Sequence, residues 1–263
     1  MESELAYRSV LAVDIEHSAG RGNAAFWRIR EVLSAALRSS FERGGIDWEA
    51  CLRDDLGDGF RVVPPPGVPK AALIHPLVPE LSARLAAHNR MAGPSTRVRV
   101  RMALHAGDVR LGPSGEVTGY PLEVLARLLD AAPLRTALAR APESVAVALL
   151  VSRHFHDETV RHGYPGIDPE SFREVAINEK EHSADAWLHL PGHPAAPPSP
   201  TRDQATGERA GREQAAGEGD DGGKRTGDRQ TGGRATMVNK ASGNGVVYAT
   251  QNGTTNIHIT GRP

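Results

Sequence analysis

A long stretch without large apolar residues limits where this chain can form a hydrophobic core. Residues 193–235 contain no Val, Ile, Leu, Phe, Trp or Tyr. Such a segment cannot bury enough apolar surface to offset the entropy lost when a chain is ordered. We therefore predict a disordered linker of Gly, Pro and charged residues over 193–236. This linker separates a globular part, residues 1–192, from a short tail, residues 237–263.

Composition and charge argue against several classes of protein. The chain carries 31 Lys and Arg against 32 Asp and Glu, a formal net charge of −1, so we expect no nucleic-acid partner. Its single cysteine, Cys51, cannot form an internal disulfide, which favours a reducing compartment. No apolar run approaches the roughly 18 residues of a membrane span, and the N-terminus lacks the pattern of a secretory signal. We therefore expect a soluble cytoplasmic protein with no membrane partner.

Apolar periodicity in the first 192 residues predicts an α/β fold. Helical spacing recurs over residues 23–43, 75–89 and 121–132. Runs typical of strands lie at 9–14, 48–53, 60–63, 97–103, 144–151, 172–177 and 186–190, and an Asp-Gly turn joins the second to the third. The first six elements follow the order β-α-β-β-α-β, which matches the ferredoxin-like split βαβ arrangement. We therefore predict a ferredoxin-like α/β sandwich.

Two aspartates end neighbouring elements of this predicted sheet. Asp14 ends the first strand, and Asp58 lies at the tip of the hairpin expected beside it. Two carboxylates that lie close together repel each other unless a cation lies between them. Mg²⁺ favours protein carboxylates together with phosphate oxygens, so the pair indicates a magnesium site. The alternative is structural: Asp58 shapes its turn and Asp14 caps the following helix.

Four segments carry a family resemblance: VDIEHSAG, LGDGFRVV, RVRVRMALHAGDV and GYPLEVLARLL. Over residues 8–190 the chain resembles the catalytic domain of class III nucleotidyl cyclases, of the short type common in actinobacteria. The resemblance implies that Asp14, the Ile15 backbone carbonyl and Asp58 bind two Mg²⁺ or Mn²⁺ ions. It also implies that Arg127 stabilises the transition state, that a His-x-Gly turn lies at residues 105–107, and that a homodimer forms the active site.

Three positions depart from the family pattern, and all three are acidic. Asp54 stands where adenine-selecting cyclases have a lysine, Glu116 where they have the aspartate that partners it, and Glu123 where an asparagine steadies the ribose or the transition state. A carboxylate at position 54 favours guanine or a pyrimidine over adenine, because it accepts hydrogen bonds from those bases. Glu116 and Glu123 would repel a triphosphate. Arg127 has an alternative role, an ion pair with Glu123 one helical turn earlier.

The resemblance implies cyclisation of a nucleoside triphosphate to a 3′,5′-cyclic nucleotide by two metal ions, with release of pyrophosphate. The acidic replacements leave a second interpretation open: a catalytically degenerate domain that binds nucleotides or dimerises as an adaptor. His17, Cys51, His75 and His105 lack the spacing of a metal or nucleophilic site, so we interpret them as structural or solvated.

The tail has the composition of a cross-β assembly motif, with two apolar arms around an uncharged core rich in Gln and Asn. Its Gln-x-Gly-x-x-Asn core resembles bacterial amyloid signalling motifs, which are related to the receptor-interacting-protein homotypic interaction motif. The residues concerned are Val246, Val247, Gln251, Gly253, Asn256, Ile257 and Ile259. The resemblance implies an effector of an antiviral or self/non-self response, recruited by self-assembly or by a receptor with a matching motif. The alternatives are a hairpin that docks on the domain and an inert tail.

Overall fold

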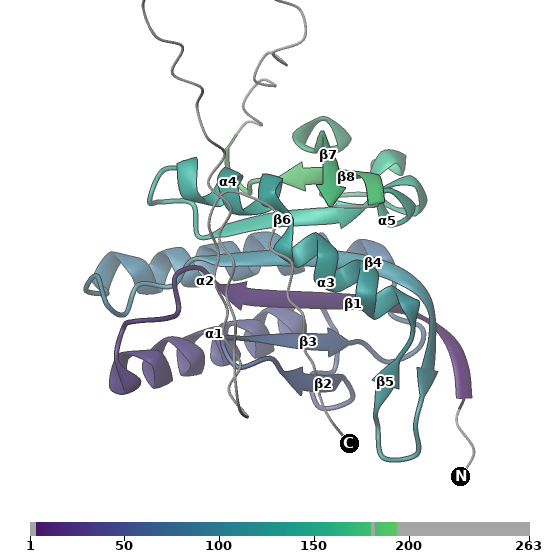
Figure 1. Cartoon of the computed structure of the whole chain (residues 1–263), viewed down its shortest axis with the longest axis horizontal. Coiled ribbons are helices and arrows are strands. Elements are labelled where there is room, and N and C mark those ends of the chain that lie inside the picture. The colour runs from purple at the N-terminus through teal and green to yellow at the C-terminus, as the bar shows by residue number, and fades with distance from the viewer. Residues whose placement is uncertain (1–3, 180–181, 194–263) are drawn as a thin grey trace, which may run out of the picture. The chain divides into compact units, whose positions relative to one another are not determined.

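A mixed sheet with strand order β2-β3-β1-β4-β6-β8-β7 forms the centre of the structure, a computed structural model that describes residues 4–179 and 182–193 (Figure 1). The strands are β1 (Glu4–Ile15), β2 (Leu52–Asp55), β3 (Gly59–Val63), β4 (Val100–Leu111), β5 (Val117–Thr118), β6 (Val147–Ser152), β7 (Arg173–Glu179) and β8 (His182–His189). The helices are α1 (Asn23–Arg43), α2 (Leu77–Met91), α3 (Tyr120–Asp130), α4 (Ala132–Arg140) and α5 (Arg153–Glu158). Neighbouring strands from β2 to β4 pair antiparallel, whereas β4 and β6 pair parallel.

Alternate residues of each strand point to opposite faces of the sheet and build two hydrophobic cores. On β1, Leu11 and Val13 pack in the core that contains α1 and α2, whereas Val10 and Ala12 pack in the core that contains α3 and α4. Asp14 follows Ala12 by two positions on the same strand. It therefore lies on the face of the sheet covered by α3 and α4.

The predicted α/β class is confirmed. The order β-α-β-β-α-β is present in β1, α1, β2, β3, α2 and β4. α1 has the predicted bounds, and each other predicted helix or strand is present with shifted ends. Apolar periodicity predicted these elements because residues that face a core recur at every second position of a strand and at every third or fourth position of a helix.

The structure differs from the sequence prediction in several features, among them the short elements β5 and α5, which were not predicted. β4 does not turn at residues 105–107 but continues to Leu111, because its second half pairs with the beginning of β1. β2 begins at Leu52 rather than at residue 48, because the Cys51 N–H bonds the Trp48 carbonyl oxygen at 3.3 Å and closes a turn. α4 was not predicted. Pro133 suggests a helix stop, but a proline in the first helical turn is tolerated since its missing N–H would have no partner there.

No helix among the residues that the structure describes is long and apolar enough to cross a membrane. The predicted linker beyond residue 193 and the tail at 237–263 lie outside the described residues. The same holds for the assembly-motif residues Val246, Val247, Gln251, Gly253, Asn256, Ile257 and Ile259.

Candidate functional site

The structure brings the two predicted metal aspartates together at the end of β1. Asp14 lies opposite Gly59 in the ladder between β1 and β3, so Asp58 directly precedes its partner. The Ile15 N–H donates to the Asp58 carbonyl oxygen at 3.1 Å, which fixes the hairpin tip against β1. Gly59 permits this approach, because a Cβ at that position would lie 1.9 Å from the Val13 carbonyl oxygen. The Gly-Asp-Gly sequence thus places one aspartate beside the other.

Asp14 is buried, with 7% of its surface exposed, and forms an ion pair with Arg101, the residue opposite it on β4. Arg101 donates from Nε and Nη2 to the two carboxylate oxygens of Asp14, at 2.8 and 2.6 Å. Burial raises the pKa of Asp14 to about 6; Arg101 lowers this pKa, and the charges of Asp58 and Asp130 raise it. A carboxylate in such a place requires a cation as partner, and Arg101 is that partner in this structure.

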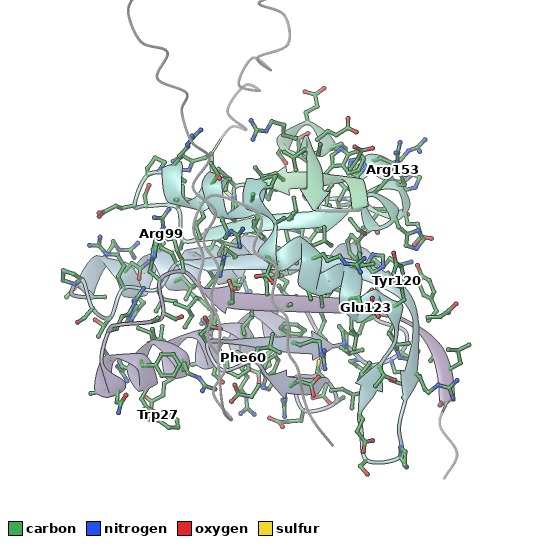
Figure 2. All side chains as sticks on the ribbon, in the orientation of Figure 1. Trp27, Phe60, Arg99, Tyr120, Glu123 and Arg153 are labelled. Carbon is green, nitrogen blue, oxygen red and sulfur yellow. The ribbon has the colours of Figure 1, made fainter. Side chains whose placement is uncertain are left out.

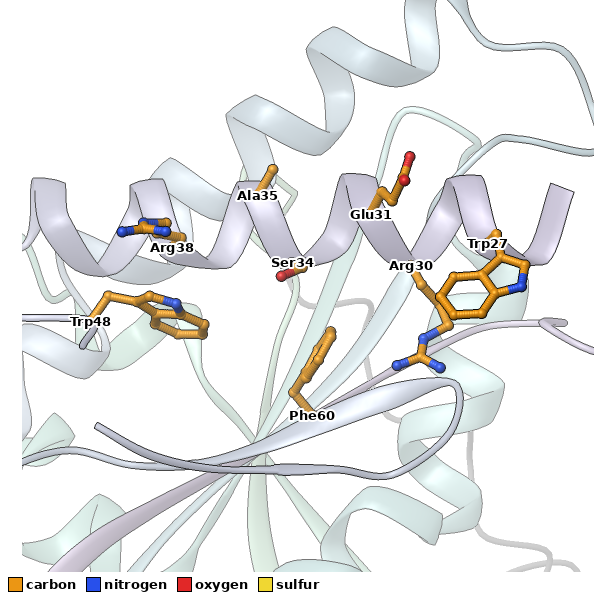
Figure 3. Close-up of a pocket in the computed structure, with 8 residues that line it drawn as sticks. All are labelled: Trp27, Arg30, Glu31, Ser34, Ala35, Arg38, Trp48 and Phe60. Atoms are coloured by element: carbon orange, nitrogen blue, oxygen red, sulfur yellow. The ribbon is translucent and has the colours of Figure 1, made fainter. Parts of the chain in front are cut away.

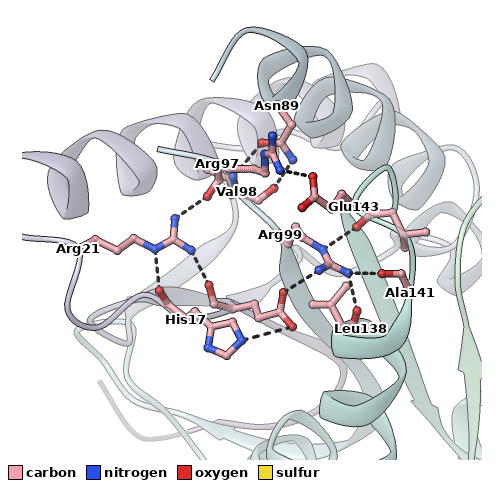
Figure 4. Close-up of polar contacts among 11 residues, drawn as sticks. His17, Arg21, Asn89, Arg97, Val98, Arg99, Leu138, Ala141 and Glu143 are labelled. Atoms are coloured by element: carbon pink, nitrogen blue, oxygen red, sulfur yellow. Dashed lines mark hydrogen bonds and ion pairs between the residues drawn. The ribbon is translucent and has the colours of Figure 1, made fainter. Parts of the chain in front are cut away.

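Asp58 accepts a hydrogen bond from the Ser18 hydroxyl at 2.7 Å. Ser18 belongs to the loop after β1, and Arg21 holds this loop by donating to the backbone carbonyl oxygens of His17 and Arg97 at 2.6 and 2.5 Å (Figure 4). Sequence reasoning missed Ser18, because its role depends on a partner 40 positions away in the chain. The loop after β1 therefore helps to fix the second aspartate.

Arg99 precedes Arg101 by two positions but has a structural role. Its guanidinium pairs with Glu16 at 3.3 Å and donates to the carbonyl oxygens of Val145 and Ala141 at 3.0 and 3.3 Å (Figure 4). Arg99 thereby joins the end of β1 to the connection between α4 and β6. Of these two arginines, it is Arg101 that pairs with the candidate metal ligand.

The two predicted base-binding residues have local partners in the structure. Asp54 accepts hydrogen bonds from Nε and Nη2 of Arg61 at 2.8 and 2.7 Å, across the ladder between β2 and β3. Glu116 lies in the turn between β4 and β5, where its carboxylate accepts from the Ser114 N–H at 3.1 Å. The turn that carries Glu116 lies beside β2, since a Cβ at Gly115 would be 3.6 Å from the Leu52 side chain.

Arg127 and Glu123 form an ion pair on α3, with Nη2 of Arg127 3.4 Å from the carboxylate. The side chain of Arg127 is 38% exposed and that of Glu123 is 63% exposed. Figure 2 shows Glu123 and Tyr120 projecting from this helix. The alternative that the sequence offered for Arg127, a pair with Glu123, is thus present. Both side chains also remain accessible to a ligand.

The donors at the end of β1 suit a hard divalent cation. Asp14 and Asp58 offer carboxylate oxygens and Ile15 offers a backbone carbonyl, and Mg²⁺ and Mn²⁺ favour oxygen ligands. Within the described part of the chain, no three His, Cys, Asp or Glu side chains are arranged to hold a metal ion. A cation at this position therefore needs further oxygens, such as those of a phosphate ester.

Cys51 and His105 have the structural surroundings expected from the sequence. Burial raises the pKa of the Cys51 thiol to about 11, and the thiol contacts the Asp47 carbonyl oxygen at 3.3 Å. Burial lowers the pKa of His105 to about 4, as does the neighbouring His154, and its Nδ1 lies 2.8 Å from the Ser152 hydroxyl. At neutral pH, Cys51 is thus not a thiolate and His105 is not protonated.

A groove of about 520 Å³ lies along α1 and is lined by aromatic rings and charged side chains: Trp27, Arg30, Glu31, Ser34, Ala35, Arg38, Trp48 and Phe60 (Figure 3). Phe60 packs against the core of α1 and α2, so the groove lies on the opposite face of the sheet from Asp14. Arg30 donates to Asp55 at 2.5 Å. Six of its eight residues lie on one face of α1 at helical spacing, and Trp48 and Phe60 complete it from other parts of the chain.

No protein-family model and no curated protein sequence matches this chain significantly. Several solved structures do match. An adenylate/guanylate cyclase/hydrolase from Silicibacter pomeroyi aligns at 18% identity and a TM-score of 0.52, covering 72% of this chain and 99% of that chain. The fold is that of nucleotidyl cyclase domains. The adenylyl cyclase CyaB from P. aeruginosa (13% identity, TM-score 0.50, 73% of this chain and 98% of that chain) has the same cyclase fold.

The guanylyl cyclase Cya2 also matches, at 12% identity and a TM-score of 0.50, over 72% of this chain and 95% of that chain. Adenylyl and guanylyl cyclases are therefore similarly close to this chain in structure. The cyclase fold does not by itself select a base. Base selection depends on side chains, and the preference for guanine or a pyrimidine expected from Asp54 stays a prediction.

Proposed function

We propose that the described domain binds a nucleoside triphosphate and cyclises it to a 3′,5′-cyclic nucleotide with release of pyrophosphate. The observation that carries this proposal is the convergence of Asp14 and Asp58 at the end of β1 in a nucleotidyl cyclase fold. The antiparallel order β2-β3-β1-β4, with α1 and α2 packed on one face, supports our assignment of this half of the sheet to the ferredoxin-like class.

Asp14, Asp58 and the Ile15 carbonyl would hold the metal ions, and Ser18 keeps Asp58 in position by donating to its carboxylate. When bound, two Mg²⁺ or Mn²⁺ ions lower the pKa of the ribose 3′-hydroxyl and neutralise the triphosphate. Arg127 would donate from its planar guanidinium to the charge that develops on the phosphate oxygens. Asp54 would accept from the edge of a guanine or a pyrimidine, with Arg61 fixing its orientation.

A homodimer is part of this proposal. Arg127 and Glu123 are exposed on α3, so both are accessible to a nucleotide held by the aspartates of a second chain. We therefore propose that each active site combines the aspartates of one chain with Arg127 and Glu123 of the other.

The proposal is tested by incubating the full chain with each of the four nucleoside triphosphates and Mg²⁺ or Mn²⁺, and separating the products. We expect one cyclic nucleotide and an equal amount of pyrophosphate. Asp58→Ala should lower turnover at least about 100-fold, because even outer-shell substitutions at metal sites cost 10–100-fold. Asp157→Ala, at a surface ion pair, is the matched control and should retain turnover. Equal turnover in Asp58→Ala and the control would refute the assignment.

A second candidate function is favoured by one observation: Arg101 already neutralises Asp14. A domain in this state could bind nucleotides or dimerise as an adaptor without turnover. Equilibrium binding of a triphosphate without any pyrophosphate release, under every metal condition, would identify this case.

We also propose that the tail at 237–263 recruits this domain in the cytoplasm, as an effector of an antiviral type of response. Clustering would raise the local concentration of the domain and favour its dimer. Ending the chain after residue 192 should abolish thioflavin-positive assemblies while the thermal unfolding of the domain stays unchanged. Assemblies that persist in the shortened chain would contradict the role of the tail.

A further inference from the structure

The strongest unassigned feature is the ion pair between Asp14 and Arg101. The two residues face each other in the ladder between β1 and β4, on the face of the sheet covered by α3 and α4. Both side chains are largely buried, with exposed fractions of 10% for Asp14 and 17% for Arg101. The contact uses both carboxylate oxygens, at 2.8 and 2.6 Å, so neither oxygen is free of a charged donor.

Arg101 differs in its partners from the neighbouring arginines. Arg21 and Arg99 each donate to several backbone carbonyl oxygens and so hold loops in place (Figure 4). Both hydrogen bonds that the described residues provide for Arg101 instead go to the Asp14 carboxylate. The loops at this end of the sheet therefore have their own anchors. The guanidinium of Arg101 neutralises the carboxylate of Asp14.

We propose that Arg101 is a built-in competitor of the divalent cation: it occupies the Asp14 carboxylate when no metal is bound, and a metal ion binds Asp14 only by displacing it. This inference rests on the proposed function, which assigns Asp14 as a metal ligand. Two cations cannot share the same two carboxylate oxygens in a buried site without strong repulsion. The metal also has to break the two hydrogen bonds between Arg101 and Asp14. The metal affinity of the free protein is therefore lower than the oxygen donors alone would give.

The same geometry suggests what receives Arg101 once it is displaced. A planar guanidinium matches a phosphate group as well as it matches a carboxylate. A triphosphate brought in with the metal would therefore offer Arg101 a second anionic partner. Metal binding is then weak without nucleotide, and a substrate favours the exchange.

The test measures Mn²⁺ binding to the nucleotide-free full chain by electron paramagnetic resonance of free Mn²⁺, at a pH above neutrality. Arg101→Met should bind Mn²⁺ at least about tenfold more tightly than the unmodified chain. Arg101→Lys keeps the positive charge but loses the planar guanidinium, so its Mn²⁺ affinity should lie between those two. Arg84→Met is the control. It removes a cation that pairs with Glu80 within α2, the helix that packs on the face of the sheet opposite Asp14. Its Mn²⁺ affinity should change by less than about twofold.

The double variant Asp14→Asn/Arg101→Met tests whether Asp14 is a metal ligand. It should lose the tight Mn²⁺ binding of Arg101→Met. If Arg101→Met binds Mn²⁺ no more tightly than the unmodified chain while Asp14→Asn abolishes binding, the competition is refuted and the metal assignment stands. If the double variant binds as well as Arg101→Met, Asp14 is not a ligand and both are refuted. Circular dichroism checks the fold of each variant, and Arg101→Lys carries the test should Arg101→Met not fold.

Discussion

Replacing Gly59 by alanine should destabilise the domain through one steric contact. A Cβ at position 59 would lie 1.9 Å from the Val13 carbonyl oxygen and 2.7 Å from the Asp14 Cα, both backbone atoms that cannot rotate away. Relieving the contact requires β3 to move roughly 1–1.5 Å away from β1, beyond which attractive van der Waals contact is regained. That movement breaks the hydrogen bond from the Ile15 N–H to the Asp58 carbonyl oxygen at 3.1 Å and opens the adjoining end of the ladder between β1 and β3.

Each lost hydrogen bond costs about 1 kcal/mol, and forced separation of packed strands adds about 1–3 kcal/mol. We therefore expect Gly59→Ala to lower the free energy of unfolding by about 3 kcal/mol, measured by urea denaturation. Gly93→Ala is the control, since its Cβ would have no atom within 4 Å, and it should change the free energy by less than about 0.5 kcal/mol. A loss below about 1 kcal/mol for Gly59→Ala would refute the close approach of β3 to β1.

Two further predictions concern the same aspartates. The pKa of Asp14 is raised to about 6 in the folded state, so its protonation stabilises the domain at low pH, and this stability is lost as the pH rises from about 4 through 6. The unmodified chain should lose about 3 kcal/mol relative to Asp14→Asn over that interval, by urea unfolding at several pH values, and parallel profiles would contradict the burial of this carboxyl. Ser18→Ala should weaken Mn²⁺ binding about tenfold, because it removes the donor that orients Asp58. Calorimetric titration measures this, and an unchanged affinity would mean that Ser18 positions nothing.

The sequence located the candidate aspartates because both lie at element ends that local patterns define. Asp14 ends a β-branched run, and the Asp-Gly turn marks Asp58. Arg101 and Ser18 could not be assigned in the same way. Their partners lie 87 and 40 positions away, and only the register of β1 with β4 and the path of the loop after β1 bring them together.

The fold shows the same division between local and distant information. The repeating apolar spacing of α1 predicts its bounds without knowledge of the sheet. The length of β4 depends instead on how far β1 extends beside it, which no local pattern in residues 105–111 records. α4 was not predicted; it follows α3 after Ala131 alone, and a proline stands in its first turn.

The groove along α1 contains a tryptophan, Trp27, whose fluorescence can be used to monitor the β2–β3 hairpin tip. Trp27 is 65% exposed, whereas Trp48 is 7% exposed. Arg30 connects this exposed indole to the hairpin, because its guanidinium lies 5.8 Å from the Trp27 ring and bonds Asp55 at 2.5 Å. We expect a shift of the tip that carries Asp58 to change how closely this guanidinium approaches the indole, and with it the emission of Trp27. Fluorescence of the unlabelled chain, with Trp27→Phe as the blank, should then report the position of the second aspartate.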